Sequence, residues 1–218
     1  LYKSDRQRLF HILFGRWWAQ SKKRVLNDLS FTVKRGESVA IMGRNGEGKS
    51  TLLKIISGDV QPNAGQVEVN GTVVAMLELS AGFDVEFTGR ENLYIKGRLI
   101  GMSNEDIARI EQDVITFAEL GEYIDQPLRT YSSGMKARLG FAFYSHCHAD
   151  ILVIDEALSV GDAEFRKKCR RKIEQIVQSD HATVLLVTHN VADAKAYCKR
   201  AITLKDGVIV DDKPAAAL

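Results

Sequence analysis

A glycine-rich stretch early in the chain has the residue types and the spacing needed to bind phosphate. Gly43-Arg44-Asn45-Gly46-Glu47-Gly48-Lys49-Ser50 fits the pattern G-x-x-x-x-G-K-[ST] at every position. Glycines let successive backbone N–H groups point at phosphate oxygens, Lys49 supplies a positive charge, and the Ser50 hydroxyl is a Mg²⁺ ligand. The pattern predicts a nucleotide site that contains Gly43, Asn45, Gly46, Gly48, Lys49, Ser50 and Thr51.

The sequence on either side of this loop supports the same interpretation. Residues 38–42 read as a buried strand, and the apolar spacing of residues 52–56 is helical. A strand that enters the loop and a helix that leaves it are the context in which this motif binds phosphate, and they argue against a chance glycine-rich turn.

A second candidate site follows the apolar residues 151–154, which end in Asp155 and Glu156. Two carboxylates beside a phosphate loop can divide the chemistry between them. Asp155 is predicted to hold Mg²⁺, and Glu156 to act as the general base or to orient the attacking water. The alternative is a strand that ends in two solvated acids, and the phosphate loop earlier in the chain favours the catalytic interpretation.

Between these sites lies Tyr131-Ser132-Ser133-Gly134-Met135, at the start of an apolar helical run. Here the chain resembles the nucleotide-binding domains of ABC transporters, whose signature is usually written L-S-G-G-Q. Ser132 and Gly134 match that signature, whereas the other three positions depart from it. The resemblance implies that Ser132, Ser133 and Gly134 contact ATP held by a second copy of the chain. The alternative is a simple serine cap at a helix N-terminus.

Other motifs of the family follow in the expected order. Residues 159–162 fall where the family has its D-loop, which implies a role for Asp162, and His189 matches the histidine that contacts the γ-phosphate. Residues 88–92 match the segment that follows the family's Q-loop, and this places Glu78 at the glutamine position, near Mg²⁺ and water. A carboxylate there cannot donate a hydrogen bond as an amide does.

The resemblance also implies an aromatic ring that stacks on adenine, upstream of the phosphate loop. Tyr2 is the first candidate, and Trp17 and Trp18 are the alternatives.

Several departures from the general signature are shared with one branch of the family. Residues 131–142, the run D-E-A-L-S-V-G-D at 155–162, and residues 77–83 resemble the ATPases of polysaccharide exporters, and the opening Leu1-Tyr2-Lys3 is most similar to those that export teichoic acid. This implies an ATP-hydrolysing subunit, with ATP and Mg²⁺, that energises export of a lipid-linked polysaccharide of the teichoic acid, O-antigen or capsule type.

The same resemblance implies the partners and the location. We expect a homodimer that sandwiches ATP, and a separate integral membrane permease subunit that contacts a groove near residues 78–87 and carries the polysaccharide. The chain would lie peripherally on the cytoplasmic face of the membrane. A drug or small-lipid cargo stays open, because cargo contacts belong to the permease.

The elements that must position these residues read as an α/β fold. Strands at 38–42, 151–154, 183–188 and 201–204, with helical sequence among them, predict a P-loop core whose mainly parallel sheet is flanked by helices. The fold is also expected to contain an antiparallel β segment. Separately, residues 29–33 read as a half-buried strand and residues 67–73 as a hairpin. We expect one domain over residues 1–218, in which 1–87 and 144–218 form the ATP-binding core and about 88–143 an inserted helical subdomain. Within residues 1–23, an amphipathic helix would lie either on a membrane surface or on its own domain.

Composition excludes several classes of protein. A net charge of +2 with interleaved signs does not favour a nucleic-acid partner, and the long heptad insertion of DNA-repair ABC ATPases is absent. The three cysteines form no C-x-x-C pair, so a zinc site is not expected. No apolar run reaches the roughly 18–20 residues that cross a bilayer.

Overall fold

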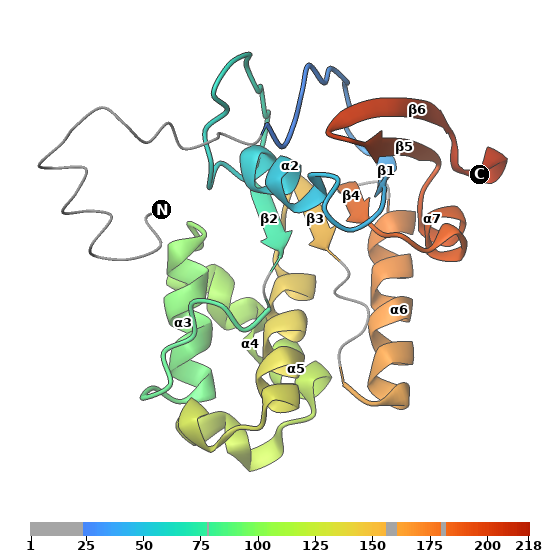
Figure 1. Cartoon of the computed structure of the whole chain (residues 1–218). Helices are drawn as coiled ribbons and strands as arrows, with labels where there is room; N and C mark the ends of the chain where they lie inside the picture. The colour runs from blue at the N-terminus through green and yellow to red at the C-terminus, as the bar shows by residue number, and fades with distance from the viewer. Residues whose placement is uncertain (1–23, 78, 156–160, 180–181) are drawn as a thin grey trace, which may run out of the picture.

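The computed structural model describes residues 24–77, 79–155, 161–179 and 182–218, which form a six-stranded sheet with helices on both faces (Figure 1). In chain order the elements are β1 (Ser38–Met42), α2 (Lys49–Ile56), β2 (Val73–Met76), α3 (Gly89–Leu99), α4 (Asn104–Ala118), η1 (Gly121–Asp125), η2 (Leu128–Thr130), α5 (Ser133–His146), β3 (Ile151–Asp155), α6 (Ala163–Gln178), β4 (Thr183–Val187), α7 (Val191–Tyr197), β5 (Arg200–Lys205), β6 (Val208–Pro214) and η4 (Ala215–Ala217).

The strand order is β2-β3-β4-β1-β5-β6, which brings the carboxyl ends of β1, β3 and β4 to one edge of the sheet. Predicted site residues lie at or after each of these three ends. β4 lies between β1 and β3 and is parallel to both, and Val187 is in register with Ile41 on one side and Asp155 on the other. Because parallel strands share the same carboxyl edge, the segments that follow β1, β3 and β4 emerge side by side. Among the described strands only β5 and β6 pair in antiparallel fashion, so the predicted mainly parallel sheet is confirmed.

Side chains of the central strands alternate between two apolar layers. Val39 and Ile41 of β1 are fully buried on the face covered by α2, which contributes Leu53. Ala40 and Met42 face the opposite layer, where α5, α6 and α7 pack. This period of two is what a strand buried on both faces requires, and it explains why residues 38–42 are all buried.

Helices α3, α4 and α5 form a second compact unit, at the lower left of Figure 1, with its own apolar core. On α4, Ile110, Val114 and Ala118 recur every four residues and face that core. α5 is shared by the two units, because Leu139 belongs to the core of the helical unit while Phe141 packs beneath the sheet. The boundary predicted for the insert, about residues 88–143, stays a prediction, because α5 runs to His146 and packs in both cores.

The strand predicted at residues 29–33 is not formed among the described residues, although the alternation that suggested it is real. Leu29, Phe31 and Val33 are partly buried against the α2 side of the sheet, and the residues between them are exposed. The Thr32 carbonyl accepts a hydrogen bond from the Arg200 guanidinium at 2.9 Å rather than from a neighbouring strand.

The hairpin predicted at residues 67–73 is also wrong. The Thr72 amide and hydroxyl both donate to Asp150 Oδ2, at 2.9 and 3.0 Å, and the Thr72 carbonyl accepts from the Ile151 amide. These bonds direct the chain after Gly71 alongside β3, so that β2 becomes a parallel edge strand instead of folding back on residue 67.

The C-terminal strand β6 was not predicted, but the sequence contains a local signal for it. Asp206 and Gly207 join β5 to β6, and both have positive φ, at 51° and 76°. An Asp-Gly pair in which both residues have positive φ is typical of a two-residue hairpin turn.

Asn92 on α3 holds the loop that leads into that helix. Its side chain is fully buried, and Nδ2 donates to the carbonyls of Asp84, Phe87 and Thr88 while Oδ1 accepts from the Asp84 amide. We expect Asn92→Ala to lower the free energy of unfolding by about 2–4 kcal/mol, because four part-buried hydrogen bonds to the backbone are lost together with a fully buried side chain. Urea unfolding measures this, and Asn104→Ala on the exposed start of α4 is the matched control. If Asn92→Ala lowers the free energy of unfolding no more than the control does, Asn92 does not hold this loop.

Candidate functional site

The loop between β1 and α2 has the backbone curl that the sequence predicts. Gly43, Gly46 and Gly48 all have positive φ, at 148°, 89° and 97°. At Gly48, a Cβ atom would also lie 2.6 Å from Leu26 Cδ2, so only glycine fits there without a shift of its neighbours. α2 begins at Lys49, and the positive end of its dipole faces the loop.

The Lys49 ammonium is held inside this curl. Its side chain is nearly buried, and Nζ donates to the carbonyls of Gly43 at 2.7 Å and Arg44 at 2.9 Å. An ammonium has three donors, so two of them brace the loop and one remains for a phosphate oxygen.

A cavity of about 430 Å³ opens over the loop, and its walls contain most of the predicted nucleotide-binding residues. It is lined by Val25, Asn45, Gly46, Gly48, Lys49, Ser50, Thr51 and Asp155. Gly43 lies at the base of the loop, where its carbonyl accepts from Lys49. Val25 was not predicted, since an isolated valine upstream of the motif carries no distinctive signal.

Two side-chain oxygens that could ligate a metal ion lie close together at one wall of this cavity. The Ser50 hydroxyl lies 3.4 Å from Asp155 Oδ2, and the two side chains come from the first turn of α2 and the carboxyl end of β3. A hydroxyl and a carboxylate are ligands that Mg²⁺ accepts, and Mg²⁺ usually completes its shell with water and substrate phosphates. No cluster of three or more His, Cys, Asp or Glu occurs within the described ranges, so this pair fits a metal bound together with phosphate rather than a closed protein site.

If Ser50 and Asp155 bind Mg²⁺, a change at Asp155 should alter how ATP turnover depends on the Mg²⁺ concentration. We expect Asp155→Asn to raise the Mg²⁺ concentration for half-maximal ATP turnover about tenfold or more, because the amide keeps the shape but removes the charge. A magnesium titration of turnover measures this, with Asp113→Asn on the exposed face of α4 as control. Equal magnesium dependence in both variants would remove Asp155 from the metal site.

His189 is at the same edge of the sheet. It follows β4 by two residues and is exposed, and the Thr188 amide between them donates to the Ile41 carbonyl of β1. The strand register therefore brings His189 to the edge at which Asp155 and the phosphate loop also emerge. Its assignment to the γ-phosphate stays a prediction. Glu78, Glu156 and Tyr2, with the alternatives Trp17 and Trp18, lie outside the described residues.

The predicted signature residues line a different cavity. Ser132 caps α5, and its hydroxyl accepts from the Met135 amide at 3.2 Å. The interpretation of Ser132 as a helix cap is therefore correct, and its contact with ATP stays a prediction. Ser132 and Ser133 are nonetheless exposed. The cavity has a volume of about 520 Å³ and is lined by Glu119, Leu120, Tyr123, Ser132, Gly134, Met135, Arg138, Gly161 and Asp162.

Arg138 lies on α5, the signature helix, which begins directly after Ser132, and it links this helix to the predicted D-loop of the same chain. Its guanidinium pairs with Asp162, lies 3.5 Å from Glu119 and stacks over the Phe165 ring. Asp162 caps α6, and the Phe165 amide holds the pKa of its carboxyl below the ordinary value, with a smaller contribution from Arg138. No local pattern in the sequence predicts this contact, because it joins residues from different helices.

The two cavities have no lining residue in common. Phosphate-loop and metal residues surround one, and signature and D-loop residues surround the other. Within a single chain, the described signature residues therefore do not line the nucleotide cavity.

Comparison with known proteins places this geometry in a family. The model of the ABC transporter family matches residues 26–159. An O-antigen export system ATP-binding protein, RfbB of Klebsiella pneumoniae, is 44% identical over 200 residues, which are 92% of this chain and 79% of that protein. The teichoic acids export ATP-binding protein TagH of Bacillus anthracis is 44% identical over 184 residues, which are 84% of this chain but only 33% of TagH.

A solved structure shows the same fold. The dimeric, post-hydrolysis state of an ATP-binding cassette bound to ADP and Pi superposes with a TM-score of 0.74, at 24% identity, over 88% of this chain and 90% of that one. In the part of the chain that the structure describes, no helix has both the length and the apolar character needed to span a bilayer.

Proposed function

The chain belongs to the ABC transporter family, and from that premise we propose that it is the ATP-hydrolysing subunit of an exporter for a lipid-linked cell-envelope polysaccharide. The observation that carries the cargo class is the identity of 44% to ATP-binding proteins of both O-antigen and teichoic acid export systems. The chain's own residues account for nucleotide chemistry, and the cargo would be carried by a separate permease subunit.

At the nucleotide site, each described residue has a defined task. The phosphate-loop amides and Lys49 bind the terminal phosphates of ATP, and Ser50 and Asp155 hold Mg²⁺. When bound there, Mg²⁺ would supply positive charge that offsets the charge of the phosphate oxygens. Glu156, which follows Asp155 in sequence, orients the attacking water, and His189 contacts the γ-phosphate. The proposal also includes Glu78, which would act near Mg²⁺ and its water.

Closure of the site requires a second copy of the chain. Ser132, Ser133 and Gly134 are exposed or partly exposed at the N-terminus of α5, where a helix dipole and a serine hydroxyl suit an anion. Because they line a cavity apart from the phosphate loop of their own chain, we infer that they meet ATP bound by the other copy. Asp162 positions the D-loop at that junction.

The loop from Val85 to Phe87 is the proposed contact with the permease. Both of these apolar side chains are more than 40% exposed, whereas the backbone around them is fixed by Asn92 from within. A rigid loop that presents apolar side chains suits a protein contact. The chain would thereby lie at the cytoplasmic face of the membrane as a peripheral subunit.

Co-purification from native membranes tests the proposal. Tagged chain carrying Glu156→Gln is isolated in mild detergent with Mg-ATP, and co-eluting proteins and glycolipids are identified by mass spectrometry. A stoichiometric multi-span membrane protein together with a polyprenyl-linked glycan is the expected result. A membrane protein with a different lipid or a drug as cargo would overturn the polysaccharide assignment, and elution with soluble proteins or nucleic acid alone would overturn the export function.

A further inference from the structure

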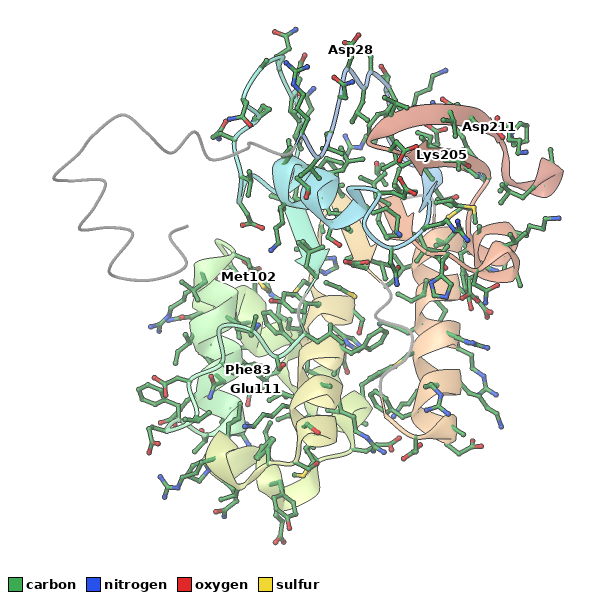
Figure 2. The ribbon with its side chains drawn as sticks, viewed as in Figure 1. Asp28, Phe83, Met102, Glu111, Lys205 and Asp211 are labelled. Atoms are coloured by element: carbon green, nitrogen blue, oxygen red, sulfur yellow. The ribbon has the colours of Figure 1, made fainter. Side chains whose placement is uncertain are left out.

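Lys96 is a cation in the interior of the helical unit. It lies on α3 and is only 4% exposed. Its Nζ donates to the Ala81 carbonyl at 2.5 Å and to the Tyr144 hydroxyl at 2.8 Å. The same nitrogen lies 4.4 Å from the centre of the Phe83 ring and 4.7 Å from that of Tyr144. Figure 2 shows Phe83 on the segment that crosses in front of α3.

This ammonium is costly to bury. Burial lowers the pKa of Lys96 to about 8, and no carboxylate within the described ranges pairs with it. A carbonyl, a hydroxyl and two ring faces compensate only in part for the lost hydration of a charge. An unbranched apolar side chain of similar length would fill the same space at lower cost. Stability alone therefore does not explain a lysine at this position.

The groups that Lys96 contacts belong to two elements with different roles. Ala81 and Phe83 lie on residues 79–88, the connecting segment, which joins β2 to α3. Tyr144 lies on α5, the helix that begins directly after Ser132. Lys96 thus touches the connecting segment on one side and the signature helix on the other.

Other contacts fasten the same segment to the helical unit on either side of Ala81. The Leu79 carbonyl packs so closely on α5 that a Cβ atom at Gly140 would lie 2.0 Å from its oxygen. Further along, Asn92 bonds the backbone of residues 84, 87 and 88. Between these two anchors, the bond from Lys96 to Ala81 is the described polar link that also reaches α5.

We propose that Lys96 is a positioning residue that fastens the connecting segment to the signature helix, so that a displacement at Val85 and Phe87 moves Ser132. The inference rests on the proposed function, because it takes the loop around Val85 as the contact with the permease. Lys96 itself lines neither the nucleotide cavity nor the cavity around the signature residues. Its removal should leave ATP chemistry intact while it weakens the transmission between the membrane subunit and the dimer.

The first test uses the chain alone. Lys96→Met removes the charge and the donor but keeps the length of the side chain, so we expect an unchanged or higher melting temperature and basal ATPase activity within about twofold of the native chain. A nitroxide at Ser80→Cys, with Cys147 replaced by alanine, should give narrower electron paramagnetic resonance lines in Lys96→Met. A nitroxide at Lys195→Cys on α7 should report no change. An unaltered line shape at residue 80 would overturn the proposal that Lys96 fastens the connecting segment to α5.

The second test uses the complex with the permease that co-purifies with the native chain, reconstituted in liposomes. We expect stimulation of the ATPase by the permease to fall about tenfold in Lys96→Met, within the range of ordinary coupling between sites. Lys195→Met should be stimulated normally. Tyr144→Phe, which removes only the hydroxyl on α5, should show a smaller loss in the same direction.

The outcomes separate this inference from the function on which it rests. If native chain is stimulated and Lys96→Met is stimulated equally, the role of Lys96 is wrong and the transporter function stands. If native chain binds no permease, the proposed function fails. The line-shape measurement then still decides whether Lys96 fastens the connecting segment to α5. A melting temperature that falls together with basal activity would assign Lys96 an ordinary structural role and overturn the inference.

Discussion

Replacing Lys49 with alanine is expected to weaken ATP binding by about 100-fold or more, because a buried charge partner of the terminal phosphates is lost. The described geometry adds a second reason. Nζ also donates to the carbonyls of Gly43 and Arg44, so its removal loosens the curl that aims the backbone amides. Both effects act on binding, before any chemistry.

Isothermal titration calorimetry with a non-hydrolysable ATP analogue measures the loss. Lys54→Ala on the same helix is the matched control, because Lys54 is exposed and is not part of the cavity wall. We expect the control to bind as the native chain does and both variants to show the same cooperative unfolding. Unchanged affinity in Lys49→Ala would contradict the assignment of the phosphate loop.

The parts of the fold and site that could be predicted are those that depend on neighbouring residues in the sequence. An apolar run before Gly43 predicts β1, and a second run before Asp155 predicts β3, because a strand buried on both faces needs unbroken apolar residues. Once both strands are placed in one parallel sheet, their carboxyl ends must share an edge. The contact between Ser50 and Asp155 follows from that topology, although the residues are 105 positions apart.

The parts that could not be predicted depend on how distant side chains meet. The pairing of Arg138 with Asp162 requires the packing of α5 against α6, and nothing in either helix's own sequence specifies the partner. Lys96 is similar, because a lysine on a helix ordinarily faces water and only the position of Ala81 shows why this one is buried. At residues 67–73, a strong local turn signal was overridden by the bonds between Thr72 and Asp150.

Glu156→Gln is expected to act at a later step than Lys49→Ala. Glutamine keeps the shape of the side chain but is not a base, so we expect turnover to fall about 100-fold or more while ATP still binds. The ATP sandwich should then persist, because the step that weakens it is blocked. Single-turnover hydrolysis and light scattering after size exclusion with Mg-ATP measure the two effects. Glu174→Gln on the exposed face of α6 is the control.

The two variants together test the order of events at the site. If Lys49 acts on binding and Glu156 on chemistry, the first variant should stay monomeric with Mg-ATP and the second should dimerise. A double variant should behave as Lys49→Ala alone, since a base has no function where ATP is not held. Near-normal turnover in Glu156→Gln would remove Glu156 from catalysis and direct attention to His189, which the strand register brings to the same edge of the sheet. A slow variant that binds ATP but stays monomeric would instead contradict the sandwich, and with it the role given to Ser132 and Gly134.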